Sequence, residues 1–215
     1  MALAVFDVDG TLVAGPSTER RLFLELLRHG WLGPRRLLAF LRFGARHAAE
    51  YGWHTWKKDK AYLAGLECAG VEANVSGWVS RSAPRWWFAP CLERLRLHRA
   101  AGDTVVLLSG TPQFLADALA RELGAARAIG TLCATAAGRF LAQPPLRHPF
   151  GPGKLELVKA LCAELHVPAA DLFAYGDSVH DLPLLQLAGH PVAVRPDPAL
   201  RVAAAAAGWE VLGRR

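Results

Sequence analysis

Two acidic residues near the start of the chain, Asp7 and Asp9, have a type and spacing that suggest chemistry. They close an apolar run, residues 2–8, that predicts a buried strand. Residues two apart on a strand point to the same face, so both carboxylates share one side of the strand end. Like charges this close need a cation or a shared proton. The stretch fits either a metal site or a plain strand that ends in an Asp-Gly turn.

A second stretch, Ser109-Gly110-Thr111, lies between an apolar run of strand type, residues 104–108, and a predicted helix, residues 113–123. Free backbone N–H groups at a helix start suit a bound phosphate. Thr111 is also able to cap that helix, with Pro112 as its first residue. Both can hold at once, and the stretch alone favours the cap.

Further charges follow in the second half of the chain. Lys154 begins a predicted helix, residues 153–165, and lacks the Ser or Thr that follows the lysine of a nucleotide-binding P-loop, which we therefore exclude. Asp177 and Asp181 follow a predicted buried strand, residues 172–175. Asp177 falls in the strand-to-helix turn, and Asp181 is typical of a helix cap.

Together these stretches indicate phosphoryl transfer. Asp7, Asp9 and Asp177 offer hard oxygen ligands, which favour Mg²⁺. Ser109 adds a hydrogen-bond donor and Lys154 a positive charge. Clustered acids, a cation and added positive groups suit phosphate chemistry, and a carboxylate there is able to attack phosphorus itself.

The elements that must position these residues form an α/β pattern. Alternation of strands and helices after residue 100 predicts a parallel sheet with right-handed crossovers. Besides those already named, we predict strands 126–132 and 191–194, a hairpin over 133–141 with its turn at 137–138, a helix over 181–188, and a closing helix before Val211-Leu212.

The first strand is followed by a helical block that is too long for a single crossover. We predict helices over residues 20–29, 34–45, 55–69, 71–81 and 90–102. We therefore expect an all-helical cap subdomain, residues 14–99, inserted into an α/β core made of residues 1–13 and 100–215.

Composition limits the class of protein. The 215 residues are 52% hydrophobic, enough for a sizeable core. No apolar run reaches the roughly 20 residues of a membrane span, and no signal peptide is evident. Four scattered cysteines suit reduced thiols in a cytoplasm. We expect a cytoplasmic protein.

The net charge of +6 is unevenly distributed. Residues 14–98 hold 14 Lys and Arg, seven Asp and Glu, and six of the seven tryptophans. Such a segment attracts nucleic acid, a membrane surface or an anionic small molecule, or is simply a solvated helical surface. It contains no nucleic-acid motif, so we expect no nucleic-acid partner, and membrane association stays open.

The stretches Asp7-Val8-Asp9-Gly10-Thr11, Ser109-Gly110-Thr111, Lys154 and Gly176-Asp177-Ser178-Val179-His180-Asp181 match, in order, the four motifs of the haloacid dehalogenase-like phosphohydrolases. A helical cap after the first motif resembles the phosphoserine-phosphatase-like branch. The tail around Asp197-Pro198 and Gly208-Trp209 is similar to that branch too.

The resemblance implies a role for each matched residue. Asp7 is the expected nucleophile, which forms a phospho-aspartate and binds Mg²⁺ through its other oxygen. Asp9 is expected to protonate the leaving alcohol and then deprotonate water, with its backbone carbonyl as a metal ligand. Lys154 is expected to neutralise charge on the nucleophile and the phosphoryl oxygens.

The remaining motif residues hold the phosphate and the metal. Ser109 and the Gly110-Thr111 backbone are expected to bind the phosphoryl group. Asp177 is expected to bind Mg²⁺ directly, and Asp181 to act on the groups around the ion.

The resemblance leaves the substrate open. Phosphoserine phosphatases carry a glutamate soon after the first motif that reads the substrate amino group, whereas the first acid here is the displaced Glu19. The cap arginine that holds the substrate carboxylate has several candidates: Arg20, Arg21, Arg81 and Arg85. We expect a small or amphiphilic phosphate ester, either phosphoserine or a lipid phosphate met at a membrane.

Two alternatives differ in mechanism. A phosphotransferase or mutase would use the same intermediate with an acceptor other than water. A non-enzymatic phosphate-binding or receiver-type module also combines acids with a lysine, but such modules lack a long helical insertion after the first strand.

Overall fold

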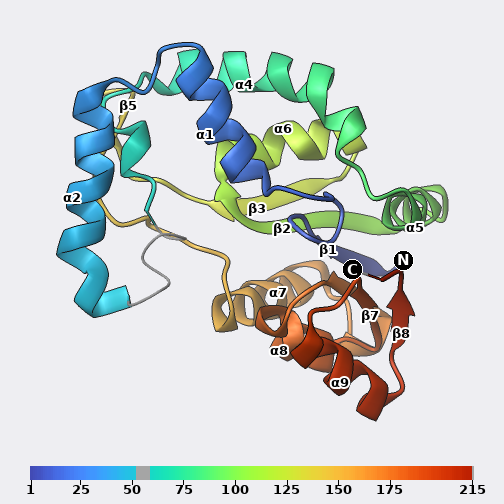
Figure 1. The fold of residues 1–215 in the computed structure, drawn as a ribbon. Helices are drawn as coiled ribbons and strands as arrows, with labels where there is room; N and C mark the ends of the chain where they lie inside the picture. The colour runs from blue at the N-terminus through green and yellow to red at the C-terminus, as the bar shows by residue number, and fades with distance from the viewer. Residues whose placement is uncertain (52–58, 215) are drawn as a thin grey trace.

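The computed structural model describes residues 1–51 and 59–214 and shows helices on both faces of a central sheet (Figure 1). Neighbouring strands of this six-stranded sheet all run parallel, in the order β3-β2-β1-β6-β7-β8. The strands are β1 (Leu3–Asp7), β2 (Thr104–Pro112), β3 (Arg127–Thr131), β6 (Leu172–Gly176), β7 (His190–Val194) and β8 (Glu210–Leu212). The predicted α/β fold with a Rossmann-like parallel sheet is confirmed.

Strand β1 lies in the middle of the sheet, and all five of its residues are buried. Leu3 and Val5 belong to one hydrophobic cluster, with residues of α7 (Pro152–Leu165), α8 (Leu182–Leu187) and α9 (Pro198–Ala207). Ala4 and Phe6 belong to another, with residues of α4 (Cys68–Ser82), α5 (Ala89–Ala100) and α6 (Gln113–Leu123). A strand covered on both faces is apolar at every position, as the sequence of β1 is.

The chain between β1 and β2 is helical wherever it forms regular structure in the described residues. The elements are α1 (Thr18–Arg28), α2 (Pro34–Tyr51), η2 (Ala61–Leu63), α4 (Cys68–Ser82), η3 (Ala83–Arg85) and α5 (Ala89–Ala100). Figure 1 shows α1, α2 and α4 on the opposite side of the sheet from α7, α8 and α9. The division into a core and an inserted cap, residues 14–99, stays a prediction.

The prediction of a helix over residues 55–69 is wrong for the residues of this range that the structure describes. Residues 55–58 lie outside the described part, and the next residues hold only the short η2 before α4 begins at Cys68. Asp59 Oδ1 accepts a hydrogen bond from the backbone N–H of Ala61 at 2.9 Å, a local bond that competes with a helix. The predicted break between the helices over 55–69 and 71–81 is also wrong, because Gly70 lies inside the first turn of α4.

Strand β2 is longer than predicted, because it runs through Ser109-Gly110-Thr111 to Pro112. Its register against β3 shifts between Leu108 and Pro112. Helix α6 starts at Gln113 with Pro112 as the residue before it, so the predicted cap by Thr111 is wrong. The Thr111 hydroxyl instead lies 3.2 Å from that of Thr18.

The hairpin predicted over residues 133–141 is present. The predicted hairpin forms from β4 (Thr135–Ala136) and β5 (Arg139–Phe140). Its turn residues Ala137 and Gly138 have φ values of 46° and 73°, as a tight hairpin turn needs. In the described part of the chain, no helix has both the length and the hydropathy needed to cross a membrane.

Asp103 ties the start of β1 to helix α5. Its Oδ1 accepts a hydrogen bond from the backbone N–H of Ala2, and its Oδ2 lies 2.9 Å from His98 Nδ1. The His98 ring continues to the Tyr175 hydroxyl of β6, also at 2.9 Å. The His98 hydrogen bond, followed by the bond from Ala2, lowers the pKa of Asp103.

We predict that Asp103→Asn lowers the free energy of unfolding by about 1.5–3 kcal/mol at pH 7, the usual loss for a hydrogen bond to a charged group. Because the folded-state pKa is lowered, the ionised carboxylate stabilises the fold above its unfolded pKa of about 3.9 and loses this effect as pH falls through the folded value. Urea unfolding of both proteins at pH 7 and at pH 2 measures the difference. A difference that does not shrink at pH 2 would contradict this role.

Candidate active site

A cavity of about 360 Å³ opens at the carboxyl ends of β1, β2 and β6. It lies where the strand order reverses between β1 and β6, the usual ligand position in open α/β sheets. All eight residues that the sequence singled out line it: Asp7, Asp9, Ser109, Gly110, Thr111, Lys154, Asp177 and Asp181. The sheet therefore brings together residues that are up to 174 positions apart in sequence.

Lys154 joins two of these acids. It lies in the first turn of α7, which Pro152 opens at a position that suits its fixed φ. Its side chain is buried, and Nζ donates hydrogen bonds to Asp7 Oδ1 and Asp181 Oδ1, both at 2.6 Å. Burial alone lowers the pKa of Lys154, but the two carboxylates outweigh burial and raise it, so the ammonium stays charged.

Asp181 is fixed by its own loop. Its Oδ2 accepts hydrogen bonds from the backbone N–H groups of Asp177 and Ser178, at 3.3 and 3.2 Å, and from the Ser178 hydroxyl at 3.1 Å. With Oδ1 held by Lys154, both oxygens of Asp181 are engaged. This supports the prediction that Asp181 orients its neighbours.

Three carboxylates, from Asp7, Asp177 and Asp181, each place an oxygen within 4.8 Å of the others. All three are buried, and Lys154 supplies one positive charge among them. Burial, and after it the nearby acids, raise the pKa of Asp7 against the opposing effect of Lys154. Oxygen donors with excess negative charge form the kind of site that takes a hard divalent cation.

Gly10 lets the first and last motifs meet. Its φ is +94°, and a Cβ built there would overlap the carboxylate of Asp177. Only glycine combines this backbone conformation with this close approach.

Asp9 lies beside the cluster and is held by helix α1. Its Oδ1 accepts a hydrogen bond from the backbone N–H of Thr18 at 2.6 Å, and its Oδ2 one from the Thr18 hydroxyl at 3.1 Å. Free N–H groups at a helix start favour a carboxylate there. Burial nevertheless raises the pKa of Asp9, with both Thr18 bonds acting against it, as suits a group that must give and take a proton.

The Ser109-Gly110-Thr111 segment forms the wall facing the acids. Ser109 Oγ accepts a hydrogen bond from the backbone N–H of Thr111 at 3.2 Å. The Gly110 carbonyl accepts one from the Thr131 hydroxyl at 2.6 Å, and that hydroxyl lies 2.8 Å from His148 Nδ1. The segment is thus fixed by β3 and by the chain before α7.

Sequence reasoning missed several residues of this cavity and the partner of one that it named. Glu19, the displaced acid after the first motif, also lines the cavity and forms an ion pair with Lys60, 2.8 Å away. Lys60 lies in the helix wrongly predicted over residues 55–69, so nothing in the sequence indicated that Lys60 would contact Glu19. His148, Phe150 and His180 form a further wall, with the Phe150 ring 5.9 Å from that of His148 and 4.5 Å from that of His180.

The candidate cap arginines lie elsewhere. None of Arg20, Arg21, Arg81 and Arg85 is among the described residues that line this cavity. Arg21 binds the carbonyls of Ala14 and Pro16, both at 2.9 Å, and so has a structural role.

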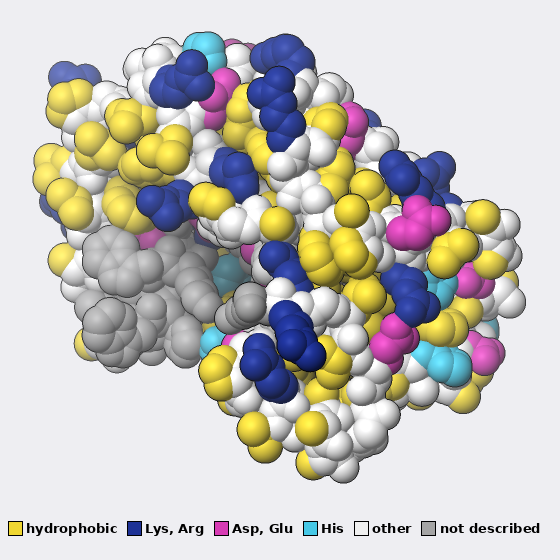
Figure 2. All heavy atoms as spheres, turned by 45° about the vertical axis from the view of Figure 1, so that its right-hand side comes forward, with side chains coloured by type: hydrophobic (Ala, Val, Ile, Leu, Met, Phe, Trp, Pro, Cys, Tyr) yellow, Lys and Arg dark blue, Asp and Glu magenta, His cyan; other side chains and the backbone are white. Residues whose placement is uncertain are grey.

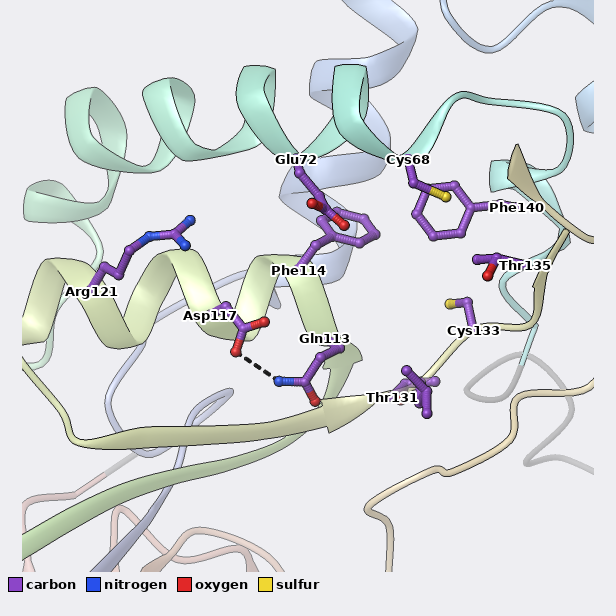
Figure 3. Close-up of a pocket in the computed structure, with 11 residues that line it drawn as sticks. Cys68, Glu72, Gln113, Phe114, Asp117, Arg121, Thr131, Cys133, Thr135 and Phe140 are labelled. Atoms are coloured by element: carbon purple, nitrogen blue, oxygen red, sulfur yellow. Dashed lines mark hydrogen bonds between the residues drawn. The ribbon is translucent and has the colours of Figure 1, made fainter. Parts of the chain in front are cut away.

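A separate cavity of about 340 Å³ lies between α4, α6 and the β4–β5 hairpin (Figure 3). Its walls carry Gln113, whose amide donates to Asp117 Oδ1 at 2.7 Å. Asp7, Asp9, Lys154 and Asp177 are not among the described residues that line it.

Comparison with known proteins agrees with this geometry. A family model described as haloacid dehalogenase-like hydrolase matches residues 4–186. The chain belongs to this family. The predicted membership is confirmed, and all four haloacid dehalogenase-like motifs meet in one cavity.

Relatives and solved structures extend the comparison. A Mycobacterium tuberculosis protein named as a probable phosphatase is 30% identical over 97% of this chain and 74% of its own length. Another from that species, named phosphoserine phosphatase, is 31% identical over 98% of this chain and 70% of its own. These relatives, with the family, confirm the predicted enzyme class of phosphatase.

Among solved structures, a protein of unknown function from Bordetella pertussis Tohama I superposes with a TM-score of 0.80, at 27% identity over 98% of this chain and 97% of its own. A substrate-bound phosphoserine phosphatase gives 0.65, at 18% identity over 100% of this chain and 93% of its own, and shows the shared fold.

We predict that Lys154→Met lowers the free energy of unfolding by about 3–5 kcal/mol in buffer without divalent cations, because it leaves buried carboxylates without their partner. Lys159→Met on the same helix is the matched control. Lys159 is half exposed and pairs with the exposed Glu156, so its loss should change stability by less than about 0.5 kcal/mol. Urea unfolding of both variants measures this, and equal effects would contradict a structural role for Lys154.

We also predict that Gly10→Ala lowers catalytic turnover about 100-fold, because displacement of Asp177 by about 1 Å misplaces a reacting group. Gly102→Ala is the control, since Gly102 has a φ of +79° and open space around its Cβ position. Both variants carry the same backbone strain, so thermal unfolding should shift similarly. Loss of turnover in both would show that strain, rather than contact with Asp177, is the cause.

Proposed function

We propose that this chain is a Mg²⁺-dependent phosphomonoester hydrolase that works through a phospho-aspartate at Asp7. The observation that carries the proposal is the contact of Lys154 Nζ with both Asp7 and Asp181, inside a cavity that also holds Asp177 and Asp9. The family and the phosphatase-named relatives support it.

The residues present fit Mg²⁺. Asp7 and Asp177, with the backbone carbonyl of Asp9, would hold it, and Asp181 would keep Asp177 and Lys154 in place. Mg²⁺ held there would supply positive charge to neutralise the phosphoryl oxygens.

In the first step, an Asp7 carboxylate oxygen attacks phosphorus and the bond from phosphorus to the leaving oxygen breaks. Asp9 gives its proton to that oxygen, and an alcohol leaves. Thr18 holds Asp9 through both carboxylate oxygens, so the proton donor is positioned before substrate arrives. Lys154 keeps Asp7 in place during the attack.

In the second step, Asp9 takes a proton from water as the water oxygen bonds to phosphorus. The bond between Asp7 and phosphorus breaks, and inorganic phosphate is released. Ser109 and the backbone N–H groups of the Gly110-Thr111 segment stabilise the phosphoryl oxygens in both steps.

We propose a small-molecule phosphate ester as substrate and the cytoplasm as location. Relatives named phosphoserine phosphatase and histidinol-phosphatase support the class of substrate. All four cysteines are free thiols, which suits a reducing compartment.

We predict that wild-type protein hydrolyses p-nitrophenyl phosphate with Mg²⁺, that EDTA abolishes this activity and added Mg²⁺ restores it, and that Asp7→Asn lowers turnover at least about a thousandfold, as expected for a lost nucleophile. Asp171→Asn, at an exposed aspartate before β6, is the control and should retain activity.

Full activity in Asp7→Asn would refute the assignment of Asp7 as the nucleophile. Phosphate that appears only on an added acceptor alcohol, and never as inorganic phosphate, would favour the phosphotransferase instead.

A further inference from the structure

A second cavity of about 540 Å³ adjoins the catalytic one, between α1, α2 and η2. The two cavities share Ser17 and Glu19. The volume lies within the range of about 300–1,000 Å³ that is usual for small-molecule sites. A molecule that places its phosphate at Asp7 therefore has room for its other end here.

Three aromatic rings shape this second cavity, which we name the aromatic cavity. The rings of Phe23, Phe40 and Tyr62 contact one another, with centroid separations of 5.5–6.2 Å. Rings that pack against each other from three different elements form fixed apolar walls. Leu24 lies at the rim, 49% exposed.

The boundary between the two cavities carries no net charge. Glu19 Oε2 accepts a hydrogen bond from Lys60 Nζ at 2.8 Å, and Glu19 Oε1 accepts one from the Tyr62 hydroxyl at 3.0 Å. Both carboxylate oxygens are thus engaged, and Lys60 balances the charge. A substrate ammonium group would have to compete with Lys60 for Glu19.

The other polar residues of the aromatic cavity do not change this picture. Asp59 is buried, and burial raises its pKa to about 7, so the carboxyl carries only part of a charge near neutral pH. Arg20 also lines the cavity, but the residue is exposed, so its long side chain is able to keep its charged group in water.

The surface around the cavity is apolar and basic. Helices α1 and α2 expose four leucines, Leu24, Leu27, Leu38 and Leu41. Figure 2 shows hydrophobic side chains next to Lys and Arg side chains on the left of the molecule. The helices that wall the aromatic cavity therefore carry exposed apolar side chains beside basic ones.

We propose that the aromatic cavity binds the leaving group of the substrate, and that this group is apolar and uncharged, such as a medium-length alkyl or acyl chain. The inference rests on the proposed phosphohydrolase function and names its substrate class. It sets this chain apart from its relative named phosphoserine phosphatase, because serine carries an ammonium and a carboxylate where this chain offers aromatic rings and an occupied Glu19.

The test measures binding separately from turnover. Methylphosphonate, octylphosphonate and the phosphonate analogue of phosphoserine cannot be hydrolysed, and calorimetry in the presence of Mg²⁺ gives their affinities for wild-type protein. Each methylene that enters the cavity leaves water, so we expect octylphosphonate to bind at least tenfold more tightly than the other two.

Two variants test whether the octyl group binds in the aromatic cavity. Leu24→Trp fills the rim of the aromatic cavity, and Leu27→Trp is the matched control, because Leu27 is 45% exposed on the same helix and does not line the cavity. We expect Leu24→Trp to reduce the octyl preference to less than threefold and to leave methylphosphonate affinity unchanged. Leu27→Trp should keep the full preference.

Each outcome decides the inference. No octyl preference in wild type, tighter binding of the phosphoserine analogue, or equal effects of both tryptophans would overturn it. An octyl preference lost only in Leu24→Trp supports it. Failure of the hydrolase proposal is visible separately, as absent turnover of octyl phosphate and p-nitrophenyl phosphate by a protein that binds the phosphonates.

Discussion

The buried ammonium group of Lys154 is the interaction on which the rest of the structure depends. It holds Asp7, at the end of β1, and Asp181, in the loop after β6, at 2.6 Å each. Without a positive charge between them, acids buried this close would repel one another and protonate. These two contacts also attach α7 to the sheet. Lys154 therefore balances the buried negative charge and also links the layer of α7, α8 and α9 to the central strand β1.

The acid cluster is rigid because its loops are tied down on both sides. Thr18 fixes Asp9 to α1, the Ser178 loop fixes Asp181, and Gly10 lets the two ends of the site approach. Glu19 and Lys60 repeat the pattern at the edge of the cavity, as a second pair of opposite charge in which Lys60 is buried and Glu19 is partly buried. One pair therefore lies at the proposed phosphate site and another at the boundary where the leaving group would pass, and the second makes that boundary neutral.

The sequence was informative where local chemistry decides the structure. Apolar runs predicted the strands. Aspartates at the carboxyl ends of β1 and β6 predicted the edge of the sheet at which the site forms. Chain order could not reveal contacts made across the fold. The bond of Asp59 to the Ala61 backbone replaced a predicted helix, and the pairing of β2 with β3 extended a strand through Thr111. Lys60 and Tyr62 reach Glu19 from 41 and 43 residues away, and no spacing rule links such positions.

The central claim is that the Asp7 carboxylate is the nucleophile. The most direct test quenches wild-type protein in acid during turnover of p-nitrophenyl phosphate, reduces the acyl phosphate with borohydride, and maps the modified residue by mass spectrometry. The account predicts conversion at residue 7 alone, dependent on Mg²⁺ and absent from Asp7→Asn. Modification at another acid, or phosphate release at full rate with no modified residue, would contradict it.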